Sequence, residues 1–403
     1  MKNFIKVTGL IILTVLLPNK SGAQSISPIK DANGKYGFTF GNFYFEVNPA
    51  LGGRITSLKM DTVQILFLDN LDEPNGSDNA GSTFWPSPQS VWNWPPLLAL
   101  NFNAYQVLSS DSNLSIRSST DATTNLYFEK IFTVNSADTS ISINYIMKNT
   151  NKLAESWAPW EITRVKASGL TFFAIGSGSV TGNMASNTKV LNNSGWYNQD
   201  STTVPTNGTY KFFCDGKGWI AHKTDSRYLF IKKFPDISKT SPAPGEAEVE
   251  CYTASDHSYT EIEDQGAYTS IPGGDSISWQ VKWYIRKLPE DIIGVSGEQK
   301  LLDFVNKTIN PNTTSIVKEQ VIGDLFEVYP NPAIQKLTII NNVEPFKNAV
   351  VSIYDLQGQL IFKVNLMKSQ SDIDLSKLNN GPYLLEISGD NNQKLFSRII
   401  VKS

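Results

Sequence analysis

Apolar and polar residues alternate with a period of two along most of the chain. The clearest case is 276–285 (SISWQVKWYI), in which every second residue is apolar and the residues between are polar. This period is typical of a half-buried β-strand. The earlier segment 258–263 (SYTEIE) also alternates, and Pro272-Gly273-Gly274 provides a turn before the later one. The pattern predicts two consecutive strands.

The same alternation predicts a hairpin over 36–47, several strands between 107 and 148, and three short strands over 211–233. Polar turn residues separate these segments at the spacing of a β-sandwich. Helical periodicity is scarce. Ser296 to Gln299 resembles a capping box and is followed by a short helical pattern, LLDFVNK. Together these patterns predict an all-β fold.

The first 23 residues have the pattern of a cleaved secretory signal peptide. Lys2 and Lys6 form a positive segment, 7–17 is apolar, and Ser21-Gly22-Ala23 provides a small-residue cleavage site. The apolar run is too short to span a bilayer comfortably. We therefore expect the protein to be exported.

Composition narrows the expected partners. The formal net charge is −3 and there is no basic stripe, so nucleic acid is not expected to bind. Aromatic residues make up 11% of the chain, which suits a neutral, ring-shaped ligand such as a sugar, and suits a large β core equally well. Cys214 and Cys251 have no histidine at metal-ligand spacing, so we expect neither a zinc site nor a cysteine nucleophile. We predict no metal ligands and no cofactor. Export would permit a disulfide between the two cysteines; two buried thiols are the alternative.

Two pairs of carboxylates occupy alternate positions on neighbouring predicted strands. Glu261 and Glu263 share one face of their strand and lie about 7 Å apart at the usual rise of a strand. They form either a solvated sheet face or a carboxylate site lining a concave sheet. Glu248 and Glu250 alternate on the strand before them and could extend the same acidic face.

The segment 81–96 (GSTFWPSPQSVWNWPP) concentrates tryptophan and proline. Four prolines argue against a helix interior or a central strand, so we expect an ordered loop. The loop either forms a wall for a ligand or plugs the core, and we favour the ligand wall. Indole faces can pack against sugar rings and a nearby amide can bind hydroxyls. The candidate binding residues are Trp85, Gln89, Trp92 and Trp94.

A second tryptophan-rich block, 155–165, adds Trp157 and Trp160 to the candidate binding residues. Glu161 could act as a general acid if the indoles raised its pKa, or it could form a structural pair with Arg164, itself a candidate binding residue. The chain has two histidines. His222 is either an acid–base residue or a buried, hydrogen-bonded histidine.

Some of these motifs resemble a known superfamily. The segment with Glu261 and Glu263, the turn IPGGDS and the strand WQVKWYI resemble the closing strands of galactose-mutarotase-like domains. The turn and strand NPALGGRITSL (48–58) resemble their early strands. This resemblance implies that Glu261 is the general base and Glu263 a sugar contact. Arg54 is either a sugar contact or a surface ion-pair partner.

The chain also departs from the superfamily's pattern. The histidine that serves aldose epimerases as general acid is missing, so Glu161 or His222 would have to donate the proton. Ser82-Thr83 stand where sugar-phosphate epimerases of the superfamily have an arginine, which argues against phosphorylated substrates. The blocks WAPWEITRV and STFWPSPQSVWNWPP together resemble a group of secreted bacterial proteins in the superfamily that has no settled activity.

The tail carries a separate set of ordered motifs. YPNP, VVSIYDLQGQLIFKV, IDLSKLNNGPYLLEIS and SRIIVKS resemble the type A sorting domain of the type IX secretion system. The resemblance implies that residues 326–403 engage the type IX machinery and that the protein crosses the outer membrane of a Gram-negative bacterium. An ordinary Ig-like binding module is the alternative.

We therefore expect a signal peptide (1–23), a mutarotase-like β super-sandwich (24–290), a linker with a short helix (291–325) and an Ig-like sorting domain (326–403). The predicted function is a secreted carbohydrate-binding or carbohydrate-active protein. If it is an enzyme, an aldose mutarotase or epimerase with Glu261 as base fits best. The alternative is a non-catalytic glycan-binding or structural surface protein.

Overall fold

The computed structural model describes residues 25–69, 79–198, 210–310, 326–341, 349–355, 359–366, 370–388 and 394–402. The chain divides into two compact units, an N-terminal unit (Met1–Asn310) and a C-terminal unit (Pro311–Ser403). The predicted signal peptide lies outside the described residues.

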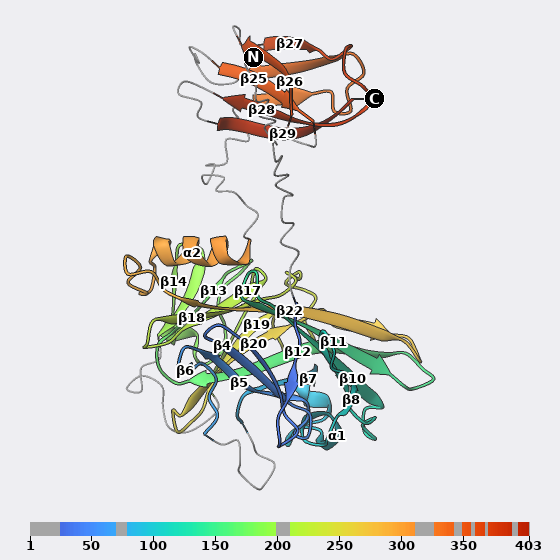
Figure 1. Cartoon of the computed structure of the whole chain (residues 1–403), viewed down its shortest axis with the longest axis vertical. Coiled ribbons are helices and arrows are strands. Elements are labelled where there is room, and N and C mark those ends of the chain that lie inside the picture. The colour runs from blue at the N-terminus through green and yellow to red at the C-terminus, as the bar shows by residue number, and fades with distance from the viewer. Residues whose placement is uncertain are drawn as a thin grey trace, which may run out of the picture. The chain divides into compact units, whose positions relative to one another are not determined.

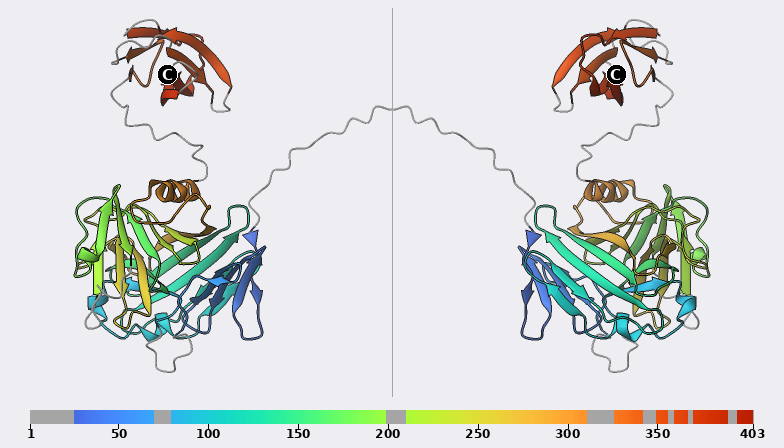
Figure 2. Two further views of the ribbon diagram at one scale, coloured as in Figure 1. Left: turned by 90° about the vertical axis from the view of Figure 1, so that its left-hand side faces the viewer. Right: turned by 90° about the vertical axis from the view of Figure 1, so that its right-hand side faces the viewer.

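Two large antiparallel sheets form the N-terminal unit (Figure 1, Figure 2). Sheet 1 has the strand order β14-β15-β13-β17-β18-β22-β11-β10-β9-β8, and β1 pairs with β10. Its strands are β1 (Ser25–Ile26), β8 (Gln106–Ser109), β9 (Leu114–Arg117), β10 (Leu126–Asn135), β11 (Ser140–Asn149), β13 (Leu170–Ala174), β14 (Thr188–Leu191), β15 (Ser194–Asn198), β17 (Trp219–Lys223), β18 (Tyr228–Lys233) and β22 (Ser276–Lys287).

Sheet 2 has the strand order β16-β19-β20-β12-β7-β5-β4-β3-β2, with β21 on β12 and β6 on β5. Its strands are β2 (Ile29–Lys30), β3 (Tyr36–Phe40), β4 (Phe43–Asn48), β5 (Arg54–Met60), β6 (Val63–Gln64), β7 (Ser82–Ser87), β12 (Glu155–Lys166), β16 (Tyr210–Cys214), β19 (Val249–Thr253), β20 (Tyr259–Gln265) and β21 (Thr269–Ile271). Short turns of helix, η1 (Gln89–Val91), α1 (Leu98–Asn101) and η2 (Ala185–Asn187), lie between strands.

The main core lies between the two sheets. Side chains at alternate positions of both sheets pack there, as the period of two predicts, and include Phe84, Ile262, Val281 and Trp283. The free thiols Cys214 and Cys251 belong to this core as well, so the described structure has the two buried thiols and no bridge between them. The prediction of an all-β fold is confirmed by these sheets.

A second apolar cluster covers the outer face of sheet 1. Helix α2 (Gln299–Ile309) packs Leu301, Leu302 and Val305 against strand residues that include Phe172 and Leu229. The sequence placed this helix in a linker, 291–325, but its apolar face is part of the N-terminal unit, which extends to Asn310.

The start of α2 also differs from the prediction. The N-cap is Glu298 rather than Ser296, and Glu298 makes no side-chain cap bond. Its carboxylate instead accepts hydrogen bonds from the backbone N–H groups of Ile293, Gly294 and Val295. Among the described residues, no helix is long and apolar enough to cross a membrane.

The C-terminal unit is a small β-sandwich with its own core. One sheet has the order β23-β24-β27 and the other β26-β25-β28-β29. The strands are β23 (Phe326–Tyr329), β24 (Lys336–Asn341), β25 (Ala349–Tyr354), β26 (Leu360–Leu366), β27 (Gln370–Asp374), β28 (Gly381–Ser388) and β29 (Lys394–Lys402). Its apolar cluster includes Leu337, Val351, Leu385 and Ile387.

Candidate functional site

The register of three strands in sheet 2 gathers five of the twelve predicted site residues on its outer face, away from the main core. Trp160 of β12 lies opposite Gln265 of β20 and Trp85 of β7, and Arg164 lies opposite Glu261. Directly opposed residues point to the same side of a sheet. Because side chains alternate along a strand, Glu263 also projects from this face.

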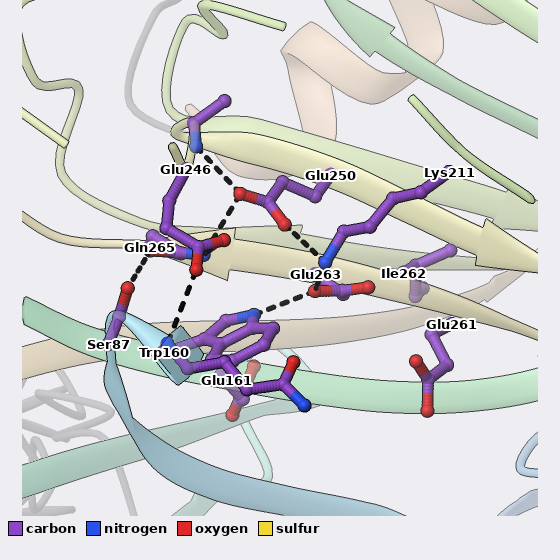
Figure 3. A network of polar contacts seen from close by, with 12 residues as sticks. Ser87, Trp160, Glu161, Lys211, Glu246, Glu250, Glu261, Ile262, Glu263 and Gln265 are labelled. Carbon is purple, nitrogen blue, oxygen red and sulfur yellow. Dashed lines mark hydrogen bonds and ion pairs between the residues drawn. The ribbon is translucent and has the colours of Figure 1, made fainter. Parts of the chain in front are cut away.

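A lysine lies between two carboxylates on this face (Figure 3). Lys211 of β16 places Nζ 2.5 Å from Glu250 Oε2 and 3.1 Å from Glu263 Oε2. The Trp160 indole donates a hydrogen bond of 2.7 Å to the same Glu263 oxygen. Glu250 and Glu263 are fully buried, so neither is on a solvated face, and Glu250 extends the acidic face as the alternation predicted.

Burial and charge oppose each other at these groups. Burial raises the pKa of Glu250 and Glu263, and the Lys211 ammonium counteracts that rise. Burial by itself would lower the pKa of Lys211, but the carboxylates of Glu250 and Glu263 outweigh it and the pKa is raised. The lysine is therefore held as a cation, and Glu263 takes up a proton more readily than an exposed carboxyl.

Arg164 connects the acidic strand with the tryptophan strand. Its Nε lies 2.9 Å from Glu261 Oε1, and its Nη1 donates a 2.9 Å hydrogen bond to Thr83 Oγ1. The guanidinium carbon lies 5.4 Å from the centre of the Trp85 ring, in cation–π contact. The Arg164 side chain is fully buried, whereas 12% of the Glu261 side chain is exposed.

Besides Glu250 Oε2, which has Lys211 Nζ at 2.5 Å, two buried atoms on this face have no hydrogen-bond partner among the described residues. They are Glu263 Oε1, an acceptor when ionised, and Arg164 Nη2, a donor. Buried polar groups in folded proteins are nearly always paired, and leaving one unpaired costs about 1–3 kcal/mol. The unmet donor and the unmet acceptor lie on the adjacent strands β12 and β20.

The tryptophans cluster next to these groups. The Trp85 ring makes edge-to-face contacts with Trp92, Trp94 and Trp160, at centroid distances of 5.7, 6.2 and 5.4 Å. Trp85 and Trp160 are buried, Trp92 is partly buried, and Trp94 is 51% exposed. Trp94 is therefore the indole in this cluster with the most surface to offer a ligand.

The proline-rich segment is not a loop throughout, which corrects one prediction. Residues Ser82–Ser87 form β7, and Pro86 lies within it opposite Pro159 of β12. Two residues without an N–H donor thus share one position of the ladder, which explains why a strand tolerates them here. The segment that follows is irregular apart from η1 and α1, and it carries Gln89, Trp92 and Trp94.

Arg54 and Gln89 lie at the edges of this arrangement. Arg54 is buried and donates to the backbone oxygens of Ala80 (3.2 Å) and Asn101 (3.5 Å). Asn101 in turn accepts a 2.7 Å hydrogen bond from the Trp85 indole, so Arg54 supports the residues that hold Trp85. The backbone N–H of Gln89 donates to Glu246 at 3.3 Å.

Three predicted site residues face the other side of sheet 2 or belong to sheet 1. Glu161 points into the core, where Lys232 Nζ lies 2.9 Å from it and both Tyr145 and Trp283 donate hydrogen bonds to it. The proposed Glu161–Arg164 pair is therefore not formed, because consecutive odd and even positions of β12 face opposite ways. Trp157 also packs in the core.

His222 is the third predicted site residue that lies away from the outer face of sheet 2. It lies on β17 in sheet 1, with Nδ1 3.0 Å from Thr171 Oγ1, opposite the core residue Phe230. Burial lowers its pKa to about 4. It matches the alternative of a buried, hydrogen-bonded histidine, and it does not reach the outer face of sheet 2.

Sequence reasoning missed both lysines that hold the buried acids. Lys211 alternates with Phe213 in YKFFC, which marks it as sharing a strand face with an apolar residue. Lys232 of β18 gave no such signal. It lies 2.7 Å from Asp264 and 2.9 Å from Glu161 in the core, and all three side chains are fully buried.

A cavity of about 310 Å³ lies at the β16 edge of this face. Its lining combines hydroxyl, acidic, basic and aromatic side chains: Ser177, Ser179, Thr181, Phe213, Cys214, Asp215, Lys239, Pro242, Gly245, Glu246, Ala247 and Glu248. Within the part of the chain that the structure describes, no group of three or more histidine, cysteine or acidic residues is arranged to hold a metal ion.

Comparison with known proteins identifies the C-terminal unit. Residues 327–402 match the family described as Secretion system C-terminal sorting domain, which confirms the prediction from the tail motifs. The chain thus carries the signal for type IX secretion, which implies an interaction with that machinery and export to the cell surface or beyond. One curated relative is an endo-acting ulvan lyase of Formosa agariphila, 29% identical over 97 residues, which are 24% of this chain and 18% of the lyase.

Several solved structures are similar to this chain at low sequence identity. They include the Slr1438 protein of Synechocystis sp. PCC 6803 (TM-score 0.47, 16% identity, 66% of this chain and 99% of that chain). A galactose mutarotase-like protein of Clostridium acetobutylicum has a TM-score of 0.45 and 10% identity, over 66% and 99% of the two chains. A putative aldose 1-epimerase of Escherichia coli K12 has a TM-score of 0.42 and 11% identity, over 63% and 99%.

Proposed function

We propose that this exported protein binds a neutral sugar on the outer face of sheet 2, between Arg164 and Glu263. The observation that carries the proposal is the buried, unpartnered pair of Arg164 Nη2 and Glu263 Oε1. A sugar hydroxyl both donates and accepts hydrogen bonds. Both atoms are covered in the structure, so a sugar reaches them only where the side chains over them move aside; two of its hydroxyls would then accept from the guanidinium and donate to the carboxylate.

The surrounding charges support a neutral ligand rather than an anionic one. Two cations of the face, Arg164 and Lys211, are each already paired with a carboxylate. Glu246, Glu250, Glu261 and Glu263 outnumber them, so a phosphate or uronate would meet repulsion. Trp94 adds a half-exposed indole against which the apolar face of a sugar ring can pack.

A second candidate function is aldose mutarotation or epimerisation, and the two carboxylates on one strand face favour it. Glu261, held by Arg164, would accept the proton of the anomeric hydroxyl. Glu263 would protonate the ring oxygen through its unpartnered Oε1, since burial raises its pKa. The acids expected from sequence, Glu161 and His222, face the core and cannot take this role.

Proton NMR on the full chain with neutral aldoses and uronic acids tests both candidates. We expect saturation transfer to neutral aldoses and little to uronic acids. Accelerated exchange of the anomeric signals that disappears in Glu261→Gln, with contact retained, would establish the isomerase and its base. Contact without exchange would leave a binding protein. Silence in both measurements would reject a sugar site.

A further inference from the structure

The cavity of about 310 Å³ is separate from the Arg164–Glu263 pair but lies along the same row of the sheet. Glu263 of β20 is opposite Glu250 of β19, and Glu250 is opposite Phe213 of β16, which lines the cavity. Adjacent strands are about 4.8 Å apart, so about 10 Å separates the strand of Glu263 from that of Phe213. A single sugar ring bound by Arg164 and Glu263 cannot also fill the cavity.

Shared residues connect the two regions. Glu246 lines the cavity and accepts a 3.3 Å hydrogen bond from Gln265 Nε2, on the face that carries Glu263. Lys211 lies between them, with Nζ 3.1 Å from Glu263 and 5.5 Å from the centre of the Phe213 ring. The side chain of Lys211 is 17% exposed.

The lining of the cavity suits a second sugar. The hydroxyls of Ser177, Ser179 and Thr181 can exchange hydrogen bonds with sugar hydroxyls, and the ring of Phe213 provides an apolar wall. Two acidic side chains of the lining already have hydrogen-bond partners. Asp215 accepts a 2.8 Å hydrogen bond from Ser177, and Glu248 accepts hydrogen bonds of 3.1 Å from the backbone N–H groups of Gly216 and Gly218.

Resting on the sugar site proposed above, we infer that the ligand is a neutral glycan chain of at least two sugar residues. One residue binds between Arg164 and Glu263, and the chain continues past Lys211 so that another residue enters the cavity. A monosaccharide would use only the first part of this surface. Chain length, rather than the identity of one sugar, is then the main determinant of affinity.

Substitution of Ser179 tests the second part of the site separately from the first. Ser179 is exposed on a loop and lines the cavity, so Ser179→Trp can fill the cavity while leaving the fold intact. Ser112→Trp, in the exposed turn between β8 and β9 of sheet 1, is the matched control. Isothermal titration calorimetry on the full chain would compare neutral monosaccharides with disaccharides and longer oligosaccharides of the same sugar.

We expect at least about a tenfold gain in affinity from the monosaccharide to the oligosaccharide, equivalent to about 1.4 kcal/mol. Ser179→Trp should abolish this gain and leave monosaccharide affinity unchanged, and Ser112→Trp should change neither. Equal affinity for short and long ligands, or a gain that survives in Ser179→Trp, would overturn the extended site alone. If no sugar of any length binds, the proposed function fails together with the inference.

Discussion

At the scale of single residues, two lysines lie on opposite sides of sheet 2, and each contacts two buried acids. Lys211 lies between Glu250 and Glu263 on the outer face, and Lys232 lies between Glu161 and Asp264 in the core. Glu263 and Asp264 are consecutive residues, so one strand presents an acid to each cation. Buried ion pairs of this kind add little net stability, but each becomes costly when one partner is removed.

The core triad should respond strongly to Lys232→Met. The substitution leaves Glu161 and Asp264 buried without a counter-charge, and we expect it to lower the free energy of unfolding by about 3–5 kcal/mol. Urea denaturation followed by tryptophan fluorescence would measure this. The control Lys300→Met removes the exposed Lys300–Asp291 pair and should have no measurable effect. If Lys232→Met were as stable as Lys300→Met, Lys232 would not be needed to compensate the buried charges of Glu161 and Asp264.

At the scale of elements, the sequence predicted that the segment after β7 carries exposed indoles, but it did not predict that helix α2 packs on sheet 1. The segment after β7 carries Trp94 beside Trp85, while α2 closes the outer face of sheet 1. The position of α2 is set by packing against strands far away in the sequence.

The exposed indole should contribute to ligand binding and little to stability. We expect Trp94→Ala to weaken binding of a neutral sugar by several-fold, because a half-exposed ring has apolar surface left to offer a ligand. Leu98→Ala, which truncates another exposed apolar residue of the same segment, should bind as the unmodified protein does. Calorimetric titration together with thermal unfolding would separate the two effects. A loss of stability without a loss of affinity would favour a plug over the core.

Helix α2 should behave as part of the N-terminal unit. Leu301 is fully buried against sheet 1, so we expect Leu301→Ala to cost about 2–5 kcal/mol of unfolding free energy. Lys300→Ala, one residue earlier and exposed, should cost little. Urea denaturation of the full chain would measure both. If Leu301→Ala were as mild as Lys300→Ala, the helix would belong to a linker, as the sequence alone indicated.

At the scale of the whole molecule, several buried acids make stability depend on pH. Burial raises the pKa of Glu248 to about 8 from its ordinary 4.5, and backbone N–H groups of Gly216 and Gly218 partly oppose it. Burial likewise raises the pKa of Asp264 to about 7, against the effect of Lys232. The folded protein thus holds these protons more tightly than the unfolded chain does. The pKa of His222 shifts in the opposite direction, since burial lowers it to about 4.

The contribution of Glu248 to the free energy of unfolding should therefore decrease as pH rises from about 4.5 to about 8. Over this range the folded state loses a proton that it binds more tightly than the unfolded chain does. His222 causes a smaller loss of stability on acidification, as pH falls from 6.5 towards 4. Urea denaturation across this range should show a flatter dependence in Glu248→Gln than in the unmodified protein, with exposed Glu290→Gln as control. Parallel profiles for all three proteins would contradict the assignment.

Export also belongs to this scale, and it bears on what the site can meet. The C-terminal unit is a sorting domain with its own core, so the secretion signal and the proposed sugar site belong to separately packed parts of one chain. On a protein delivered to the surface or beyond, the proposed site would be open to polymers outside the cell, as the inferred oligosaccharide ligand requires.

The sequence by itself determined the all-β class, the sorting tail and the face shared by Glu261 and Glu263, because strand alternation and ordered motifs are local properties. It could not show that Glu161 and Trp157 face the core, since the side of a sheet that becomes buried depends on partners distant in the chain. Only the tertiary structure brought Lys211 to Glu263 and Lys232 to Asp264, because each pair joins different strands. It also decided which buried atoms lack a hydrogen-bond partner, and the proposed sugar site rests on two of them.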